Sequence, residues 1–574
     1  MIGQLSSDIA AASPLRVRWL GRVRYEDASE LQHALLRGGG DYLLLLEHPH
    51  VYTLGVRAKA DHLLDGIASS GASVVRADRG GDVTYHGPGQ LVGYPIVDIA
   101  LGPGAVPAHV HRIEQLIIDV LADLGLGGVG RLDGYPGVWV DAAGASPRKI
   151  CAIGVRVQRG RSMHGFALNV DPDLSMFGNI VPCGIPDKAV TSLSAEGIGA
   201  TMAEVVDAVA ARAAQLVSPF GAVASRRIER QDASPAATSQ APSGPAGGGA
   251  VPIELRPLGR RLAASGVDLR SSVGMRERKP EYIRAPLKIG PQVIGLRSML
   301  RELGLVTVCE EAGCPNLSEC WADGTATFMI NGERCTRACG FCLVDTSHPL
   351  PLDPAEPEHV AEAVARLGLA HVVVTGVARD DLGDGGAEAF ARTIAAIRRR
   401  SPGAAVEVLI PDCKGDEQAL RTVFDARPDV LNHNIETVLR LQRAVRPSAS
   451  YARSLSVLGR AKAAGMVTKS GMILGMGERE DEVHGALADL RAVGVDIVTI
   501  GQYLRPTKRH LPVARWWRPE EFEAMAQVGR ALGIAHVEAS PLTRSSYHAR
   551  EAAAGAGAAA TAAGSRTATG SAAS

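Results

Sequence analysis

At 574 residues the chain is too long for a single hydrophobic core, and its length predicts either several domains or two large ones. Lysine plus arginine and aspartate plus glutamate balance at 61 each, so the net charge indicates neither a nucleic-acid partner nor an acidic membrane surface. No run reaches about 18 uninterrupted apolar residues, and the N-terminus lacks a basic start before an apolar core. We therefore expect a soluble, cytoplasmic protein.

The first half of the chain mixes apolar runs such as "YLLLLEHP", "QLVGYPIVDI" and "GVWVD" with Gly-Pro turns. Within it, "AHVHRIEQLIIDVLADLG" (residues 108–125) has the apolar spacing of one amphipathic helix. Short strands around a long helix predict an α+β domain with a mixed sheet.

Four motifs in this half carry candidate chemistry. The segment "RGGDVTYHGPGQLVGYP", residues 79–95, is rich in glycine and proline, which indicates a tight loop beside a ligand or a neighbouring backbone. Further along come "RKICAIGVRV" with Lys149, "HGFALNV" with His164 and "VPCGIPDKAVTSL" with Cys183. Together the four motifs resemble lipoyl(octanoyl) transferase over about residues 14–222. The resemblance implies a biotin/lipoate ligase-like mixed sheet.

The resemblance also implies a site. Cys183 is the implied nucleophile that forms an acyl thioester, and Lys149 is the implied group that lowers the pKa of its thiol. A thiol of pKa about 8.5 is mostly protonated at neutral pH, and a nearby ammonium favours the thiolate. The implied acyl pocket comprises segments 79–86, 152–154 and 165–167, which are Arg79, Gly80, Gly81, Asp82, Val83, Thr84, Tyr85, His86, Ala152, Ile153, Gly154, Gly165, Phe166 and Ala167.

The implied reaction is acyl transfer without ATP. Exchange between thioesters is nearly thermoneutral, so Cys183 can take octanoate from the phosphopantetheine thioester of an acyl carrier protein and pass it to a lysine amine. The resemblance implies that this lysine belongs to a lipoyl domain of a 2-oxoacid dehydrogenase or to the glycine cleavage H protein.

Three alternatives stay open for this half. A lipoate–protein ligase activates its acid as an acyl adenylate and needs no cysteine. Cys183 could instead be a buried structural thiol in a scaffold that only binds acyl carrier proteins. On a strand, Cys151 would share a face with Lys149 two residues away, which makes it a second candidate for the reactive thiol.

Between the halves, residues 229–250 read "ERQDASPAATSQAPSGPAGGGA" and contain almost no large apolar side chain. Such a segment cannot bury enough surface to offset its ordering entropy, so we expect a linker between two independent units. The alanine- and glycine-rich C-terminus predicts a disordered tail by the same reasoning.

The second half alternates short apolar runs with amphipathic stretches, beginning with "HVVVTGV" followed by "AEAFARTIAAIRRR". This repeating βα pattern predicts a parallel sheet that is closed or partly closed into a barrel. Chemistry in such barrels lies at the carboxyl ends of the strands. The candidate strand-end residues are Thr375, Pro411, Asn432, His433, Asn434, Ser470, Met472 and Gln502.

Nine cysteines are an odd number for a disulfide framework, and six of them form two tight clusters. The first cluster, Cys309, Cys314 and Cys320, has C-x4-C-x5-C spacing; the second, Cys335, Cys339 and Cys342, has C-x3-C-x2-C spacing. Thiolates suit zinc or iron–sulfur clusters, and a cluster held by only three thiolates keeps one iron open for a ligand. A zinc site pooled from both sets is the alternative.

The C-x3-C-x2-C spacing is similar to that of radical S-adenosylmethionine enzymes. With "CEEAGCPNLSECW", "RDDLGDGGA", "NHNIETV", "SGMILGMGE", "GQYLRPT" and "RSSYHA", it closely resembles lipoyl synthase over about residues 270–548. The resemblance implies an α/β partial TIM-type barrel that uses S-adenosyl-L-methionine and two 4Fe–4S clusters. One cluster is held by Cys335, Cys339 and Cys342; the other, which gives up its sulfur, is held by Cys309, Cys314, Cys320 and Ser546.

By this resemblance the second half inserts two sulfurs at C6 and C8 of a bound octanoyl chain, with electrons from a donor such as ferredoxin or flavodoxin. The alternative is an iron–sulfur protein that only carries electrons or stores a cluster. The predicted organisation is an octanoyltransferase domain over residues 14–222, a flexible linker over 223–262, a lipoyl synthase domain over 263–548 and a disordered tail over 549–574.

Single residues of the second half also allow two interpretations. Asn434, Gln502 and Arg505 at the strand ends are candidates for cofactor or substrate contact, and each is equally compatible with a structural role at the barrel lip. Cys413 in "LIPDCKGD" is interpreted as a small packed thiol.

Overall fold

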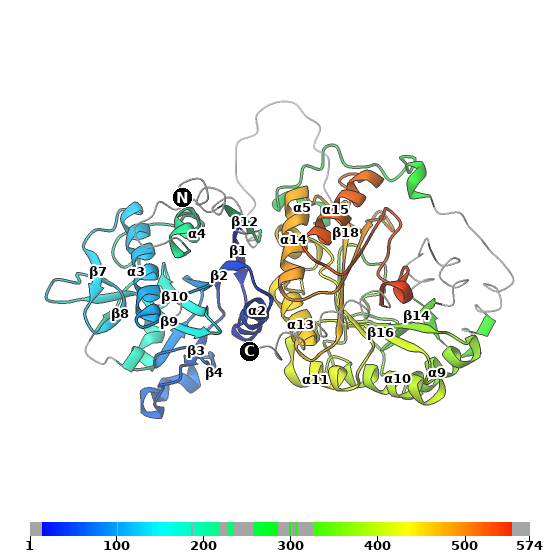
Figure 1. The fold of residues 1–574 in the computed structure, drawn as a ribbon, viewed down its shortest axis with the longest axis horizontal. Helices are drawn as coiled ribbons and strands as arrows, with labels where there is room; N and C mark the ends of the chain where they lie inside the picture. Colours follow the sequence, from blue (N-terminus) through cyan, green and yellow to red (C-terminus); the bar gives the residue numbers. More distant parts are fainter. Residues whose placement is uncertain are drawn as a thin grey trace, which may run out of the picture. The chain divides into compact units, whose positions relative to one another are not determined.

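The computed structural model describes residues 14–99, 102–184, 188–217, 227–234, 257–284, 298–299, 302–303, 305–307, 316 and 325–553. The chain divides into two compact units, Met1–Ala233 and Ser234–Ser574 (Figure 1). The two halves of the sequence therefore fold as separate units.

The N-terminal unit is built on a mixed sheet whose described strands follow the order β12-β1-β2-β6-β10-β9-β8-β7, with β11 beside β9. β12, β1 and β2 are parallel, and the pairings from β2 onward to β7 are antiparallel. The bounds are β1 Leu15–Arg22, β2 Asp41–Glu47, β6 Gln90–Ile96, β7 Val129–Leu132, β8 Tyr135–Val140, β9 Arg148–Gln158, β10 Arg161–Asn169, β11 Ala189–Val190 and β12 Ile228–Asp232. A smaller sheet contains β4 Ser73–Arg76, β3 Val51–Leu54 and β5 Val83–His86. The predicted α+β fold with a mixed sheet is confirmed.

Helices α2 (Tyr25–Gly38), α3 (Ala105–Asp123) and α4 (Met202–Arg212) accompany this sheet. The apolar side chains of α3 recur three and four residues apart, so they form one stripe along the helix. That stripe is fully buried in a core shared with Leu43, Leu45 and Leu91 of the sheet. The helix predicted over residues 108–125 is confirmed, and it packs on the sheet that carries the candidate site.

The first unit extends further than the composition indicates. β12 pairs in parallel with β1 from Ile228 to Asp232, and Glu229 forms a 2.8 Å ion pair with the buried guanidinium of Arg18. The predicted linker over residues 223–262 therefore begins too early. The reason is physical: a ladder of backbone hydrogen bonds at a sheet edge needs no large apolar side chain.

The predicted boundaries of the second unit differ in the same way. Helix α5 (Pro257–Ala264) begins within the predicted linker, which ends at residue 262, and its Leu262 is fully buried. Residues 549–553 are helical within the predicted tail, and Ala552 packs beside Ile497. Small side chains such as alanine can be buried efficiently, so a composition poor in large apolar residues misplaces both ends.

We expect that replacing residues 228–232 with a Gly/Ser sequence lowers the melting temperature of the N-terminal unit by at least about 5 °C, because the β12 ladder and the partner of Arg18 are both lost. The same replacement at residues 236–240 is the matched control and should leave the melting temperature unchanged. Calorimetry on the full chain measures both. Equal melting temperatures for the two variants would contradict the assignment of β12 to the folded unit.

The C-terminal unit is a half-open barrel of βα repeats. Its described strands follow the chain order β13 to β20; β14 to β20 are all parallel and β13 is antiparallel to β14. Their bounds are β13 Val306–Thr307, β14 Thr325–Ile330, β15 His371–Gly376, β16 Ala405–Leu409, β17 Val430–Asn432, β18 Val467–Leu474, β19 Ile497–Gln502 and β20 His536–Ala539. No pairing among the described residues closes the path from β13 to β20. The predicted partial barrel is confirmed.

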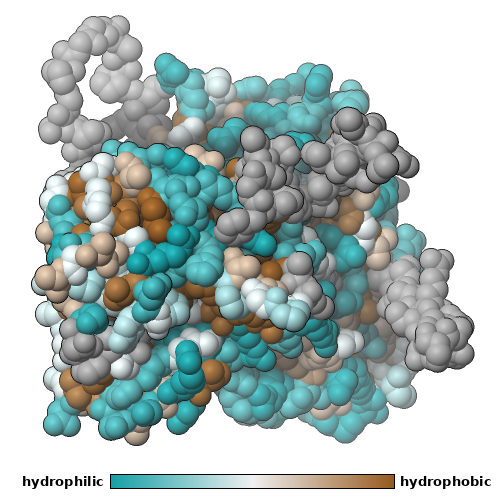
Figure 2. Space-filling view, turned by 60° about the vertical axis from the view of Figure 1, so that its left-hand side comes forward, coloured by the Kyte–Doolittle hydropathy of each residue, from teal (hydrophilic) through white to brown (hydrophobic). Residues whose placement is uncertain are grey.

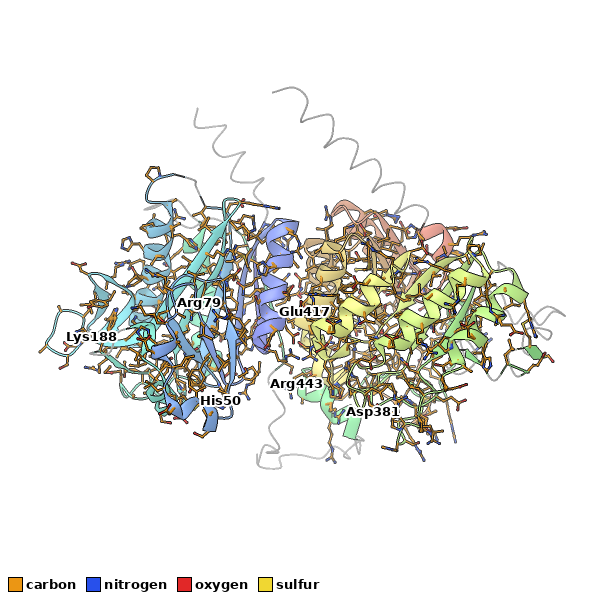
Figure 3. All side chains as sticks on the ribbon, turned by 90° about the horizontal axis from the view of Figure 1, so that it is seen from below. His50, Arg79, Lys188, Asp381, Glu417 and Arg443 are labelled. Atoms are coloured by element: carbon orange, nitrogen blue, oxygen red, sulfur yellow. The ribbon has the colours of Figure 1, made fainter. Side chains whose placement is uncertain are left out.

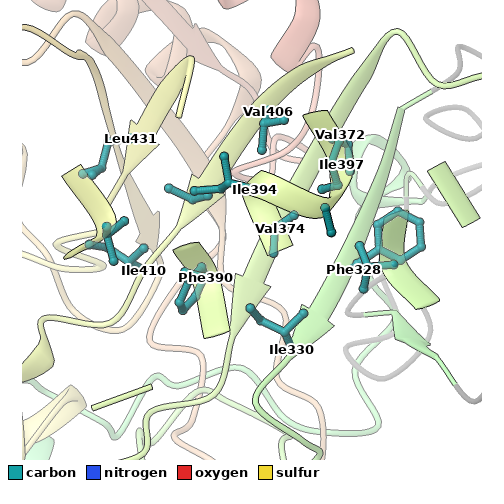
Figure 4. Packing of buried hydrophobic residues seen from close by; sticks show 14 of the residues in the cluster. Phe328, Ile330, Val372, Val374, Phe390, Ile394, Ile397, Val406, Ile410 and Leu431 are labelled. Atoms are coloured by element: carbon teal, nitrogen blue, oxygen red, sulfur yellow. The ribbon is translucent and has the colours of Figure 1, made fainter. Parts of the chain in front are cut away.

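Helices cover the outer face of this sheet (Figure 1). They are α9 Glu356–Leu367, α10 Ala387–Arg400, α11 Glu417–Asp425, α13 Tyr451–Ala463, α14 Glu480–Ala492 and α15 Pro519–Ala531; the short α12, Gln442–Val445, lies against the cysteine loop, whose Gly340 N–H donates to Val445 O. Alternate strand residues such as Phe328, Ile330 and Val374 pack against Phe390 and Ile394 of α10 (Figure 4). The residues between them, beginning with Thr327 and Met329, therefore point into the barrel.

The amino ends of the strands enclose a charged layer inside the barrel. Lys469 Nζ lies 3.0 Å from Glu407 Oε1, His371 Nε2 lies 3.5 Å from the other carboxylate oxygen, and Asn432 Nδ2 donates to Glu407 over 3.1 Å. All four side chains are buried. Burial opposes ionisation of Glu407, but Lys469 and His371 hold the pKa of its carboxyl below the ordinary value. These four side chains therefore fill the barrel interior on the amino side, which leaves room for a cavity toward the carboxyl ends of the strands.

Hydrophilic residues predominate on the face seen in Figure 2, with hydrophobic residues in smaller groups between them. Among the residues described by the structure, no helix combines the length and the apolar character needed to span a bilayer.

Candidate active sites

A cavity of about 470 Å³ in the N-terminal unit gathers most of the predicted acyl-pocket residues. Its wall contains Arg79, Gly80, Gly81, Asp82, Thr84, His86, Lys149, Ala152, Ile153, Gly154, Gly165, Phe166 and Ala167. Arg79 lies among the strands of this unit, whereas His50 and Lys188 lie toward its periphery (Figure 3). Segments distant in the sequence, from β5, β9 and β10, thus meet around one space.

Val83 and Tyr85, which belong to the predicted pocket segment 79–86, do not line the cavity. They pack with Tyr52 and Phe177 on the opposite side of β5, and the Tyr85 hydroxyl lies 2.7 Å from His50 Nδ1. Successive side chains of a strand point to opposite faces, so a contiguous segment cannot line one space with every residue. These two residues are corrected to a structural role.

Two glycines on the wall are required by close backbone approach. A Cβ at Gly154 would lie 2.9 Å from the Gly80 carbonyl oxygen, and one at Gly165 would lie 2.3 Å from the Gly93 carbonyl oxygen. Arg79 fixes the loop beside them, because its guanidinium donates to Thr53 O over 2.7 Å and to Gly80 O over 3.1 Å. The glycine-rich motif therefore allows strands and loop to meet closely at the cavity.

Lys149 places a buried ammonium on the cavity wall. Its side chain is 8% exposed and its Nζ lies 4.7 Å from the centroid of the Trp139 ring. Among the described residues, no carboxylate lies within ion-pair distance of Lys149. A buried ammonium without an anion is costly, so this position favours an anionic partner in the cavity.

The turn that carries Cys183 borders the same cavity. Pro182–Gly184 forms a single 3₁₀ turn, and Gly184 lies on the cavity wall. Just after it, β11 pairs Val190 with Lys149. The side chain of Cys183 lies outside the described part of the structure; its backbone stands one residue from the wall and is tied to the strand of Lys149.

Cys151 does not share the face of Lys149, contrary to the prediction. Val138 pairs with Cys151 and Trp139 with Lys149, so β9 has one extra residue, Ile150, at a bulge. Cys151 is fully buried in the apolar core, and burial raises the pKa of its thiol well above the ordinary range. The bulge removes Cys151 from the cavity, which leaves Cys183 as the candidate nucleophile.

The inner wall also carries Tyr25, which no motif singled out, together with Tyr94 of the quoted segment 79–95 and His164 of the motif "HGFALNV". Burial lowers the pKa of His86 well below its ordinary value and raises that of Tyr94 well above it, so both remain neutral. His164 Nε2 lies 2.7 Å from Asp78 Oδ1. Of these residues, Tyr25 alone lies outside the quoted motifs, and no spacing signal identifies it.

A second cavity, of about 410 Å³, opens at the carboxyl ends of the barrel strands. Cys335, Cys339, Cys342 and Ser546 all line it. So do the predicted strand-end residues Thr375, Pro411, His433, Asn434 and Gln502. Asn432, Ser470 and Met472 do not: Asn432 donates to Glu407, and the Ser470 hydroxyl accepts from the Ile435 N–H.

The loop that carries Cys335, Cys339 and Cys342 is anchored to neighbouring segments by backbone hydrogen bonds and ion pairs. The Cys335 N–H donates to Asp345 O over 2.8 Å, and the Gly340 N–H donates to Val445 O over 2.8 Å. Arg337, between the first two cysteines, forms ion pairs with Asp380 at 2.7 Å and Asp412 at 2.6 Å. A loop anchored on both sides directs its three thiols toward one space.

The donor set fits an iron–sulfur cluster. Burial raises the pKa of Cys342 to about 12 and that of Cys339 above its ordinary value, so a metal that binds there must release protons. Among the described residues no three side chains converge closely enough to hold a single metal ion. Thiols that bind different irons of one cluster stand further apart than ligands that share one ion. Cys309, Cys314 and Cys320 lie outside the described residues.

Asn434, Gln502 and Arg505, the three candidates for cofactor or substrate contact, differ in whether they line the cavity and in what they bond. Asn434 Nδ2 donates to Glu436 Oε1 over 3.0 Å and to Ser545 Oγ over 2.8 Å at the cavity. Gln502 lines the cavity, but its amide bonds the backbone of Tyr503 and Trp517. Arg505 does not line the cavity; its guanidinium donates to the His510 and Lys508 carbonyls.

Glu436 and Arg446 line the cavity and were not identified from the sequence. Glu436 has φ of 65°, an uncommon backbone conformation for a side-chain-bearing residue, and burial raises the pKa of its carboxyl. Arg446 donates to the carbonyl oxygens of Asn434 and Ile435. The motif "NHNIETV" contained the signal for Glu436, but only the fold places its carboxylate beside the thiols.

Cys413 is buried in the core between the barrel and its helices, and burial raises the pKa of its thiol to about 12. The prediction of a packed thiol is confirmed.

The comparisons with known proteins match one family model in each of the two units. Residues 24–214 match the family model described as the lipoyl protein ligase A/B catalytic domain, and residues 329–490 match that of the radical SAM superfamily. The lipoyl synthase of Rubrobacter xylanophilus is 56% identical over 278 residues, which are 48% of this chain and 87% of that protein. The lipoyl synthase of Mycobacterium ulcerans is 53% identical over 293 residues, 51% of this chain and 90% of that protein.

The chain also aligns with the solved bi-partite lipoate protein ligase of Thermoplasma acidophilum at 16% identity and a TM-score of 0.31. The alignment covers 36% of this chain and 84% of that one, an overlap too weak to carry an argument. The sequence matches suffice for one assignment: the chain belongs to the lipoyl synthase family through its C-terminal unit, while its N-terminal unit is similar to the lipoyl protein ligase A/B catalytic domain.

Proposed function

We propose that the N-terminal unit transfers octanoyl from octanoyl-acyl carrier protein to a lysine of an apo lipoyl domain through a thioester on Cys183. The supporting observation is the buried Lys149 ammonium, which lacks a described carboxylate partner and lies on the cavity beside the Pro182–Gly184 turn. The ammonium stabilises the thiolate, and the apolar side chains Val92, Ile153 and Phe166 of the cavity wall would accept the acyl chain.

We propose that the C-terminal unit then inserts two sulfurs, at C6 and C8 of that octanoyl chain. Cys335, Cys339 and Cys342 would hold one 4Fe–4S cluster; Cys309, Cys314, Cys320 and Ser546 would hold the second. When bound, the first cluster supplies the electron that cleaves S-adenosyl-L-methionine, and thus the means of removing hydrogen from an unactivated carbon. Apolar side chains of the barrel cavity, Met329, Val373, Leu409 and Ile473, would seat the acyl chain.

The proposed partners follow from this chemistry. The acyl donor is the octanoyl-acyl carrier protein, and the acceptors are lipoyl domains of 2-oxoacid dehydrogenases and the glycine cleavage H protein. The electron donor is ferredoxin or flavodoxin, and the reaction takes place in the cytoplasm. The transferase domain is proposed over residues 14–222 and continues to β12 (Ile228–Asp232), its last strand; the lipoyl synthase domain is proposed from α5 through the helical residues 549–553.

The test is incubation of the reconstituted protein with octanoyl-acyl carrier protein, apo lipoyl domain, S-adenosyl-L-methionine and a reductant, without ATP. The mass of the lipoyl domain should pass through the octanoyl form to the lipoyl form. Modification that requires free octanoate and ATP would instead assign the N-terminal unit as a ligase. S-adenosyl-L-methionine left intact would leave an electron-carrying role for the C-terminal unit.

Ser546 gives a sharper expectation for the second cluster. An alkoxide is a harder and more exchangeable iron ligand than a thiolate, so it suits a cluster that must open. Ser546→Cys should keep the iron and sulfide content and the cleavage of S-adenosyl-L-methionine, yet yield little lipoyl product. The matched control is Ser545→Ala: Ser545 accepts one hydrogen bond from Asn434, whose other bond to Glu436 remains, so its effect should be mild. Full lipoyl formation by Ser546→Ala would remove this serine from the site.

A further inference from the structure

One hydrogen-bonded histidine–aspartate pair on the cavity wall of the N-terminal unit has no part in the reaction described so far. His62 ends a short 3₁₀ turn, Ala60–His62, and its Nδ1 lies 2.7 Å from Asp82 Oδ2. Their side chains are 18% and 12% exposed, and both line the cavity. A carboxylate only accepts hydrogen bonds, so Nδ1 carries the hydrogen and Nε2 is the nitrogen available for proton transfer. Among the described residues, Nε2 has no hydrogen-bond partner.

This pair lies against the turn that carries Cys183. The Val181 N–H donates to His62 O over 3.0 Å, and the next residues form a bridge between Leu63 and Ile180. On the other side of the cysteine, a Cβ at Gly184 would lie 2.8 Å from Asp82 Oδ2 and 3.2 Å from His62 Cε1. The residues flanking Cys183 are therefore in contact with the His62–Asp82 pair.

Acyl transfer to an amine needs a group that accepts and returns a proton. The amine loses a proton when it forms the amide, and the departing carrier sulfur gains one. Lys149 cannot do this while it remains an ammonium, since an ammonium has no acceptor site. His86 has both ring nitrogens engaged, with Gln90 at 2.7 Å and Thr53 at 3.3 Å. His62 has both a ring nitrogen without a partner among the described residues and the contact with the turn.

We propose that His62, oriented by Asp82, is a further catalytic residue that carries this proton; the inference rests on the proposed thioester at Cys183. In the first step the Cys183 thiolate attacks the acyl carbon, the bond from that carbon to the carrier sulfur breaks, and protonated His62 gives its Nε2 proton to the departing sulfur. In the second step the lysine nitrogen attacks the same carbon, the bond to Cys183 breaks, and His62 takes the amine proton. The cysteine returns as a thiolate, and one proton has moved from the amine to the carrier thiol.

Changing the leaving group of the acyl donor tests whether His62 donates a proton to the departing sulfur. Cys183, stabilised by Lys149, is a better leaving group than an alkyl thiol, so the intermediate returns to reactants unless the departing alkyl sulfur is protonated. An aryl thiolate leaves without a proton. The test measures acyl-enzyme formation by rapid quench and intact mass, with octanoyl-acyl carrier protein and with octanoyl thiophenol as donors.

His62→Gln should slow acylation from the carrier thioester on the order of 10²-fold and from the thiophenol ester by less than about 3-fold. Asp82→Asn should show the same selectivity with a smaller loss. His111→Gln, whose side chain is 56% exposed and outside the cavity, is the matched control and should change neither rate. A structural role for His62 would slow both donors equally; equal slowing, or no slowing, would overturn the proposal. If the unsubstituted protein forms no acyl-enzyme, or if Cys183→Ala still forms one, the proposed thioester at Cys183 is overturned instead.

Discussion

Cys183→Ala is expected to stop octanoyl transfer while a lipoyl domain that already carries octanoate is still converted to the lipoyl form, and Cys339→Ala is expected to do the reverse. The reason is that each cavity is lined by residues of one unit alone. Each loss should be complete within detection, because a missing nucleophile or a missing ligand of a three-thiol site has no substitute among the described neighbours.

The measurement is the mass of the lipoyl domain, started from the apo form in one series and from the octanoyl form in the other. Cys151→Ala is the control for the first unit, since its thiol packs in the core and away from the cavity. Retained transfer in Cys183→Ala together with lost transfer in Cys151→Ala would move the nucleophile to Cys151.

Lys149→Met is expected to shift the pH dependence of Cys183 alkylation upward by about one unit or more, with a roughly 10-fold slower reaction at pH 7. Methionine keeps the length and the packing against Trp139 but removes the charge. A positive neighbour favours the thiolate, so its removal raises the pH at which the thiolate forms; the rate should recover above the shifted pKa.

The readout is the rate of single-site alkylation at Cys183 between pH 6 and pH 10, with peptide mapping to separate it from other thiols. Lys149→Arg restores the charge and should restore most of the rate at pH 7. A pH profile that stays in place in Lys149→Met, or a Lys149→Arg variant as slow as methionine at pH 7, would contradict the role given to this ammonium.

The sequence predicted both folds, and many of the residues that line the two cavities, because these signals are local. Periodicity defines the βα repeats, and the close spacing of Cys335, Cys339 and Cys342 needs only one loop to bring the thiols together. The strand-end residues Thr375 and His433 followed from the topology of parallel barrels.

What the sequence could not predict depends on register and on distant contacts. The bulge at Ile150 turns Cys151 away from Lys149, and a bulge leaves no mark in the pattern of residue types. His62 reaches the cysteine turn through a bridge to residues more than a hundred positions later, and no spacing motif encodes that contact. Composition likewise failed for β12, because a strand edge is stabilised by backbone groups that every residue carries.

The interior of the barrel is filled on the amino side of the thiol cavity by a layer of buried polar side chains. These are Lys469, Glu407, His371 and Asn432. Among the described residues, the cavity lined by the three thiols lies at the carboxyl ends of the strands, so a reactant reaches them from that end of the barrel. A freely diffusing acyl substrate would compete with the other reactants for entry to this cavity. A reacting chain tethered to a long, thin lysine arm meets this constraint better, because the arm alone enters while the domain that bears it stays outside.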